Sequence, residues 1–226
     1  MSCGFNLYHL EEIFEEAKSK YKIIRCLDYD VMKNISKKLL INRIDIDLDL
    51  KMAKSIYHIF NKLGIKATYF VRLHGPYNPF SIENLNFLYE LVRNGNEIGY
   101  HSEVLDCSNL LSIGVPSSDI VRADLSTFSN FFIGIWGVAS HRDATMYNNQ
   151  DFWNINELSK FGLEYDAYGE MFFDSFYVSD SDITNWKCYD KGKLVTGDNR
   201  CLCQHIKEEH KILYSLIFIV FYHRIR

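Results

Sequence analysis

The sequence has few of the features that separate domains or carry a chain into a membrane. It contains only three prolines and no tract rich in glycine, serine or any single residue, so no linker or disordered arm is expected. The most apolar run, Ile212 to Tyr222, is much shorter than the roughly 20 residues of a membrane helix, which favours a buried strand. We therefore expect one domain over residues 1–226, with a lead-in at 1–38 and the main fold at 39–226.

The charge balance also lacks extremes. The net charge is −4, the two signs are interspersed, and no concentrated basic surface of the kind that binds nucleic acid is indicated. The N-terminus has no basic segment followed by an apolar run, so no signal peptide is expected and a cytoplasmic location is predicted. In that compartment the six cysteines are expected to be reduced. The sequence does not indicate an oligomeric state.

What the sequence does contain is an alternation of short apolar segments with amphipathic ones. Strands are predicted at 22–26, 39–47, 66–71, 95–101, 132–139, 163–167, 176–180 and 212–222, and helices at 10–20, 51–63, 81–94, 115–131, 154–161 and 202–210. Asp49 and Ser81 are predicted helix caps, as is Ser117 or Ser118. This alternation predicts an α/β fold, a distorted or incomplete barrel with parallel strands, with a doubly wound open sheet as the alternative.

Several predicted strands end in side chains that bind metal ions. Asp45 and Asp47 alternate with apolar residues and so share one face of their strand, although a solvated acidic face would give the same pattern. His101 and Glu103 follow the strand at 95–101. His141, with Arg142 beside it, follows the strand at 132–139, where a polar loop is the alternative. Strand carboxyl ends form the rim on which parallel barrels build active sites. The ligand types suit a divalent metal, zinc above all, with Co, Ni or Mn as alternatives.

A second group of possible ligands is close together in the sequence. Cys201, Cys203, His205 and His210 follow a C-x-C-x-H-x4-H spacing. That spacing lacks the two separated ligand pairs of the usual structural zinc sites. The local pattern therefore favours a helix with small buried thiols.

These segments resemble the polysaccharide deacetylases of the NodB-homology family. R-I-D-I-D (43–47) occupies the place of the family's first motif, which is T-F-D-D or, in a divergent branch, R-H-D-V-D. The pattern from Ala53 to Val71 matches the family's next helix and strand, and G-N-E-I-G-Y-H-S matches its H-S/T motif. The resemblance implies a distorted (β/α)7 barrel with parallel strands. It also implies that Asp45 is a general base and that Asp47 and His101 are metal ligands.

The chain departs from the family pattern at two places. The family's second histidine is Leu105 here, so Glu103, Asp106 or His141 must replace it, and we favour His141 because a strand holds its backbone. The family's late Leu-x-His-Pro motif falls in L-Y-S-L-I-F-I-V-F-Y-H. Phe218 or Ile219 then occupies the position of the catalytic-acid histidine, and His223 could serve only in a shifted register.

The resemblance implies a metal-dependent hydrolase that removes an N-acetyl group from an amino sugar. The expected substrate is a carbohydrate, an N-acetylated sugar or glycan precursor used in surface-glycan biosynthesis. The alternative is a catalytically impaired barrel of the same fold that binds a sugar or a protein. A third possibility is an enzyme of related fold that acts on another amide or on a phosphate ester.

Overall fold

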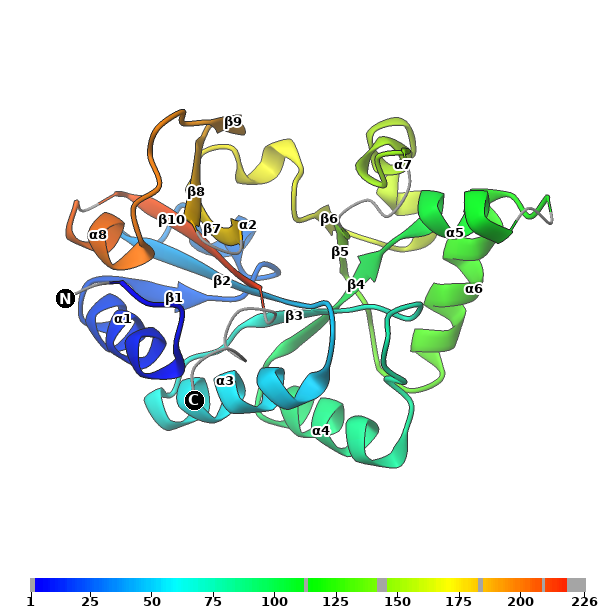
Figure 1. Ribbon diagram of the computed structural model, residues 1–226, viewed down its shortest axis with the longest axis horizontal. Helices are drawn as coiled ribbons and strands as arrows, with labels where there is room; N and C mark the ends of the chain where they lie inside the picture. The colour runs from blue at the N-terminus through cyan, green and yellow to red at the C-terminus, as the bar shows by residue number, and fades with distance from the viewer. Residues whose placement is uncertain (1–2, 112–113, 142–145, 183–184, 209, 219–226) are drawn as a thin grey trace.

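The computed structural model describes residues 3–111, 114–141, 146–182, 185–208 and 210–218. Its centre is a curved sheet with the strand order β6-β5-β4-β3-β2-β10-β7-β8-β9, with β1 also paired to β2 (Figure 1). The strands are β1 (Lys22–Ile24), β2 (Leu39–Ile46), β3 (Thr68–Val71), β4 (Glu97–Ser102), β5 (Gly137–Ser140), β6 (Tyr165–Asp166), β7 (Phe176–Asp182), β8 (Asn185–Asp190), β9 (Lys193–Leu194) and β10 (Ile212–Phe218).

The predicted α/β fold with a mostly parallel, barrel-like sheet is confirmed. Each neighbouring pair from β6 through β10 to β7 is parallel. The last described strand, β10, lies between β2 and β7, so it pairs with a strand from the first quarter of the sequence. The β8–β9 hairpin was not predicted, and it extends the sheet with antiparallel pairs. Among the described strands, no pairing joins β6 to β9, so the curled sheet is open on that side.

Most of the helices cover the outer side of the sheet (Figure 1). The helices are α1 (Leu7–Lys20), α2 (Tyr29–Met32), α3 (Leu50–Leu63), α4 (Ile82–Arg93), α5 (Val104–Leu111), α6 (Ser117–Ser129), α7 (Gln150–Ile155) and α8 (Leu202–Lys207), with 3-10 turns at Leu158–Phe161 and Glu170–Phe172. Tyr29 of α2 and Phe172 pack instead in the core on the inner face of the sheet. Two predicted caps are confirmed. Asp49 accepts hydrogen bonds from backbone N–H groups in the first turn of α3, and Ser81 does so at α4.

The predicted cap of α6 is wrong. Pro116, not Ser117 or Ser118, is the N-cap residue, and no side chain caps the helix there. The hydroxyl of Ser117 instead donates to Ser108 at 3.1 Å. The strand predicted at 132–139 is also shorter than expected, because Gly134 adopts a positive φ of 78° that ends extended structure before β5.

The two faces of the sheet have different environments. Ile44 and Ile46 of β2 pack in the core beneath the helices, while Leu39 and Ile41 belong to a second core on the inner face. Because side chains alternate along a strand, Asp45 follows Leu39 and Ile41 onto the inner face. This alternation carries polar groups into the inside of the curved sheet, at the end where β2 stops.

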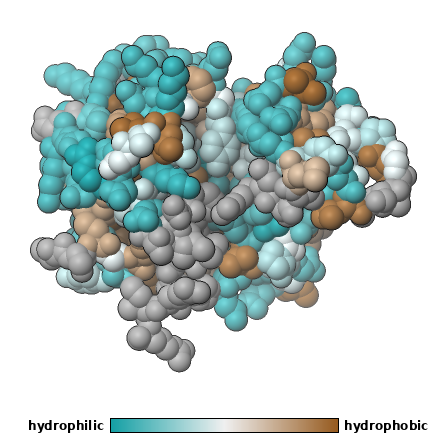
Figure 2. Space-filling model, turned by 45° about the horizontal axis from the view of Figure 1, so that its top comes forward, coloured by the Kyte–Doolittle hydropathy of each residue, from teal (hydrophilic) through white to brown (hydrophobic). Residues whose placement is uncertain are grey.

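The surface shows no single large apolar region in the orientation of Figure 2. Hydrophobic residues occur there in small groups among hydrophilic ones. No helix in the described part of the chain combines the length and the apolar character that crossing a membrane requires.

Candidate metal and catalytic site

The predicted site residues from β2, β4 and β5 meet at one rim of the sheet. Strands β2, β3, β4 and β5 are adjacent and parallel, so their carboxyl ends lie side by side. Asp45 lies at the end of β2 and Asp47 is the residue after that strand, while His101 comes from β4 and His141 is the residue after β5. Asp45 and His101 are almost completely buried, and Asp47 and His141 are only slightly more exposed. The structure therefore brings these four side chains together at one rim of the sheet.

His101 has one fixed ring orientation. Its Nδ1 donates to the carbonyl oxygen of Ala139 at 2.9 Å, so a neutral ring would carry its lone pair on Nε2. That Nε2 lies 3.1 Å from Asp47 Oδ1 and 3.6 Å from Asp45 Oδ2. A lone pair facing two carboxylates is unfavourable, so a positive charge, either a proton or a metal ion, is required between them.

His141 approaches the same carboxylate from β5. Its backbone N–H donates to the carbonyl of Ser102 at 2.7 Å, which fixes the start of this loop against β4. Its Nε2 lies 3.7 Å from Asp47 Oδ1, and its Nδ1 has no hydrogen-bond partner among the described residues. Asp47 thus lies between the two imidazoles, whose ring centroids are 5.3 Å apart.

Asp45 differs from Asp47 because its carboxylate is already paired with an arginine. The Nε and Nη2 groups of Arg43 donate to its two oxygens, each at 2.8 Å. Arg43 is fully buried and lies over the rings of Phe70 and Tyr168. This contact fixes the carboxylate of Asp45 beside the His101–Asp47 pair, and it leaves Asp47 as the carboxylate whose side chain faces the two histidines.

Glu103 is held by a second arginine, which the sequence interpretation did not consider. Arg72 donates to both of its oxygens, at 2.5 and 3.2 Å, and also to the backbone carbonyl of Asp47 at 2.9 Å. Glu103 Oε2 is 4.0 Å from His141 Nδ1, so it lies behind the histidine as seen from Asp47. Arg72 follows β3 two positions after Phe70, and that alternation was the signal that could have placed it on the inner face.

The electrostatic environment shifts the pKa values of the two histidines in opposite directions. Burial alone would lower the pKa of His101, but the charge of Asp45 and the hydrogen bond to Asp47 outweigh it and raise the pKa. Burial and the positive charge of His101 together lower the pKa of His141. Burial alone would raise the pKa of Asp47, but its hydrogen bond to His101 leads to a lowered value. Asp47 is therefore ionised and His141 neutral near pH 7, which are the forms that bind metals.

These donors fit a divalent metal. One carboxylate and two imidazoles form the three-ligand set of many catalytic zinc sites, with bonds of about 2.0–2.2 Å. The 3.1 Å between Asp47 Oδ1 and His101 Nε2 is a normal separation for two ligands of one such ion. In the described structure, the ligand atoms of Asp47, His101 and His141 do not all lie within 4.8 Å of one another. Binding would therefore draw His141 inward.

The other residues considered from the sequence lie elsewhere or outside the described chain. Asp106 lies in α5, where the side-chain amide of Asn149 donates to it at 2.8 Å. Arg142, Ile219 and His223 lie outside the described residues, and Phe218 ends β10 without a described side chain. The late catalytic-acid position therefore stays a prediction.

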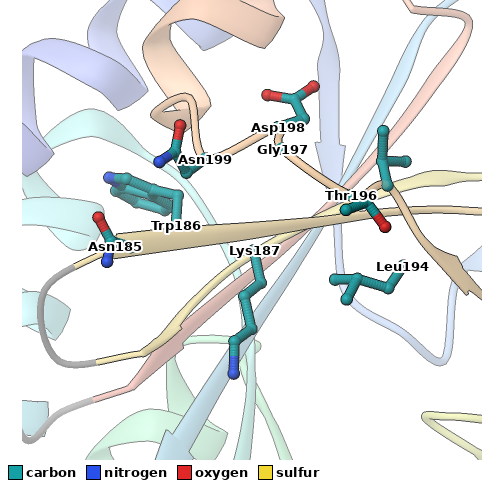
Figure 3. A pocket seen from close by; sticks show the side chains of 9 residues that line it. Asn185, Trp186, Lys187, Leu194, Thr196, Gly197, Asp198 and Asn199 are labelled. Atoms are coloured by element: carbon teal, nitrogen blue, oxygen red, sulfur yellow. The ribbon is translucent and has the colours of Figure 1, made fainter.

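A pocket on the β8–β9 hairpin is separate from this site. It is lined by residues 185–187 and 194–199, which include the segment leading to α8 (Figure 3). Trp186 and Lys187 extend from opposite sides of β8 in that view. None of the five predicted site residues lines this pocket.

Comparison with known proteins gives one structural likeness. No family model matches the chain, and no curated protein matches it. The chain is similar to the solved structure of the chitin deacetylase from the fungal pathogen Colletotrichum lindemuthianum, with 12% identity and a TM-score of 0.46 over 80% of this chain and 74% of that chain. A likeness at this level leaves the function to be argued from the site itself.

Proposed function

We propose that this protein is a metal-dependent hydrolase that removes an N-acetyl group from an amino sugar. The observation that carries the proposal is the position of Asp47 Oδ1, which lies 3.1 Å from His101 Nε2 and 3.7 Å from His141 Nε2 beside a second buried carboxylate. A carboxylate flanked by two imidazoles, one of which moves inward on binding, is suited to a divalent cation. A further carboxylate next to them is suited to proton transfer.

Each residue has a distinct role in this proposal. Asp47, His101 and His141 hold the metal, with zinc as the first choice and Co, Ni or Mn as alternatives. When bound, the metal supplies Lewis acidity that polarises an amide carbonyl and makes a water molecule more acidic. Asp45 accepts the proton from that water, and Arg43 keeps its carboxylate in one orientation.

Glu103 has a supporting role rather than a ligand's role. Its ion pair with Arg72 ties the loop after β4 to the end of β3, and Arg72 also holds the backbone at Asp47. This arrangement stabilises the loops that carry the ligands. Outer contacts of this kind orient metal ligands and tune their affinity.

The proposed substrate is an N-acetylated sugar or glycan precursor, by analogy with the motifs in 43–47 and 95–102. The test is release of acetate from N-acetylglucosamine oligomers by purified protein, first stripped with a chelator and then reloaded with Zn²⁺, Co²⁺, Ni²⁺ or Mn²⁺. We expect metal-dependent acetate release that Asp45→Asn and Asp47→Ala abolish.

Asp49→Asn is the matched control, because Asp49 belongs to the same acidic run but caps α3, and asparagine is also a good cap. Its activity should equal that of the unchanged protein. Acetate release that survives both the chelator and Asp47→Ala would refute the metal-dependent mechanism. Metal and oligosaccharide binding without any acetate release would instead identify the protein as a sugar-binding module.

A further inference from the structure

Three thiols and one imidazole form a compact cluster far from the rim of the sheet. Cys3, His9, Cys201 and Cys203 each contribute one atom, and these four atoms all lie within 4.8 Å of one another. Cys3 Sγ is 3.4 Å from Cys203 Sγ, and Cys201 Sγ is 3.4 Å from His9 Nε2. The cluster joins the two ends of the described chain, since the N-terminal segment and α1 lie beside α8 (Figure 1).

The two cysteines of α8 are placed by the start of that helix. Cys201 is the N-cap residue, and the side chain of Gln204 accepts a hydrogen bond from its backbone N–H at 3.1 Å. In return, the Cys201 sulfur accepts a hydrogen bond from the backbone N–H of Gln204. This reciprocal capping fixes the sulfur of Cys201 with Cys203 close beside it.

The N-terminal pair is placed by equally specific contacts. Asn6 caps α1 by accepting from the backbone N–H of His9 at 2.8 Å. Phe5 stacks on Trp186 of β8 with ring centroids 5.3 Å apart, which anchors the segment that carries Cys3. These contacts bring two residues from the start of the chain to a helix about 200 positions later.

The imidazole of His9 is oriented as zinc ligands are. Its Nδ1 lies 3.4 Å from a carboxylate oxygen of Glu12, one turn further along α1, and its Nε2 faces Cys201. A carboxylate behind the distal ring nitrogen is the usual outer partner of a metal-binding histidine, because it fixes the tautomer.

We propose that Cys3, His9, Cys201 and Cys203 bind one structural zinc ion. With bonds of about 2.3 Å to sulfur and about 2.0–2.1 Å to nitrogen, the ligand atoms of a tetrahedral zinc ion lie about 3.5–3.8 Å apart, close to the separations in this cluster. Three cysteines and a histidine complete the four positions, as in structural rather than catalytic sites. Binding releases the three thiol protons to solvent, and no redox change is involved.

Two nearby groups are less suited to a metal. Cys188, Asp198 and His205 form one, and His205, Glu208 and His210 the other. Both oxygens of Asp198 accept hydrogen bonds from Arg200, which also pairs with Glu208. The carboxylates of Asp198 and Glu208 are therefore already paired with the positive charge of Arg200. The thiol cluster contains no carboxylate, and Cys201 is almost completely buried.

The consequence for the fold is a link between its first helix and its last. A zinc ion held by α8 and the N-terminal segment would tie α1 to the end of the chain that leads into β10. Removal of the ion should loosen that contact while leaving the rim at Asp47 and His101 unchanged. The inference is independent of the proposed hydrolase activity.

The test uses the whole protein and Co²⁺ as a spectroscopic probe. Co²⁺ loaded into metal-free protein should give the intense thiolate-to-cobalt absorption and tetrahedral visible bands of a thiolate-rich site. In the Asp47→Ala variant, which lacks a ligand of the rim site, one equivalent should saturate this signal. Cys201→Ser and Cys203→Ser should weaken or abolish this signal. Cys107→Ser, a half-buried thiol outside the cluster, should leave it unchanged, as should Asp47→Ala.

A second measurement does not depend on variants that fold. In zinc-loaded protein, Cys3, Cys201 and Cys203 should resist alkylation, and a chelator should expose all three together, whereas labelling of Cys107 should not change. Mass spectrometry of the labelled peptides gives the readout. Absence of thiolate-to-cobalt absorption, unchanged alkylation after chelation, or a disulfide between Cys3 and Cys203 in protein purified without reductant would each overturn the proposal.

Discussion

Arg43 and Asp45 form a bidentate ion pair on the inner face of β2, with two contacts of 2.8 Å and no solvent exposure of either side chain. The two residues are two positions apart, so the pleat of the strand places them on the same face. The pair lies directly beside the Asp47–His101 contact. Asp45, the predicted catalytic base, therefore also contributes to the stability of the inner core.

The first prediction concerns this pair. Asp45→Asn should lower the free energy of unfolding by about 3–5 kcal/mol, because it leaves the guanidinium of Arg43 buried without its counter-charge. Urea denaturation followed by circular dichroism measures the change. The double variant Arg43→Met/Asp45→Asn removes both charges and should recover much of the loss. An unchanged midpoint in Asp45→Asn would show that solvent reaches Arg43.

The second prediction separates His141 from Glu103 as a ligand. His141→Ala should weaken zinc binding at the rim by more than the roughly 10–100-fold that loss of an outer partner causes, whereas Glu103→Ala should stay within that range. The reason is that Glu103 is paired with Arg72, while His141 Nε2 faces Asp47. Calorimetric titration of protein whose thiol cluster is already loaded gives both affinities. The opposite order would make Glu103 the ligand.

The third prediction is the pH dependence of metal binding at the rim. The raised pKa of His101 means that Nε2 keeps its proton to a higher pH than in a free histidine, whose pKa is about 6.5. Zinc must displace this proton, so affinity should fall as the pH drops through the raised pKa and should level off above it.

In the metal-free protein, the stability of the fold should change with pH in the opposite direction from the zinc affinity. The stabilising contact of protonated His101 with Asp45 and Asp47 is fully present below about pH 6.5 and is lost as the pH rises through the folded-state pKa. Titrations of protein whose thiol cluster is already loaded, in buffers of different ionisation enthalpy, should detect a proton released on zinc binding at the rim near neutral pH. No proton release there would contradict this account.

The fourth prediction concerns the close packing beneath the site. A Cβ added at Gly99 of β4 would lie 2.4 Å from ring atoms of Phe70, which is fully buried and lies under Arg43. Gly99→Ala should therefore cost about 1–3 kcal/mol of stability by overpacking. Thermal unfolding measures the loss. Phe70→Leu in the same chain frees space at the clash, so adding Gly99→Ala to that variant should cost less than it does alone.

The sequence alone determined the elements and the residues that could carry chemistry. The period-two pattern of β2 placed Asp45 and Asp47 on one face, and the motif around His101 identified the second strand end. Local rules also located the caps at Asp49 and Ser81, because capping depends on residues within one turn. They failed at Ser117, where Pro116 takes the cap position.

The tertiary structure decided which of these groups meet. The pairing of Arg72 with Glu103 depends on the register of β3 and β4, which the sequence alone does not specify. Cys3 and His9 join Cys201 and Cys203 only because α1 packs beside α8, so the local spacing around Cys201 showed only half of the ligand set. Contacts within a strand or a helical turn follow from spacing along the chain, whereas contacts between distant segments follow from how the whole sheet folds.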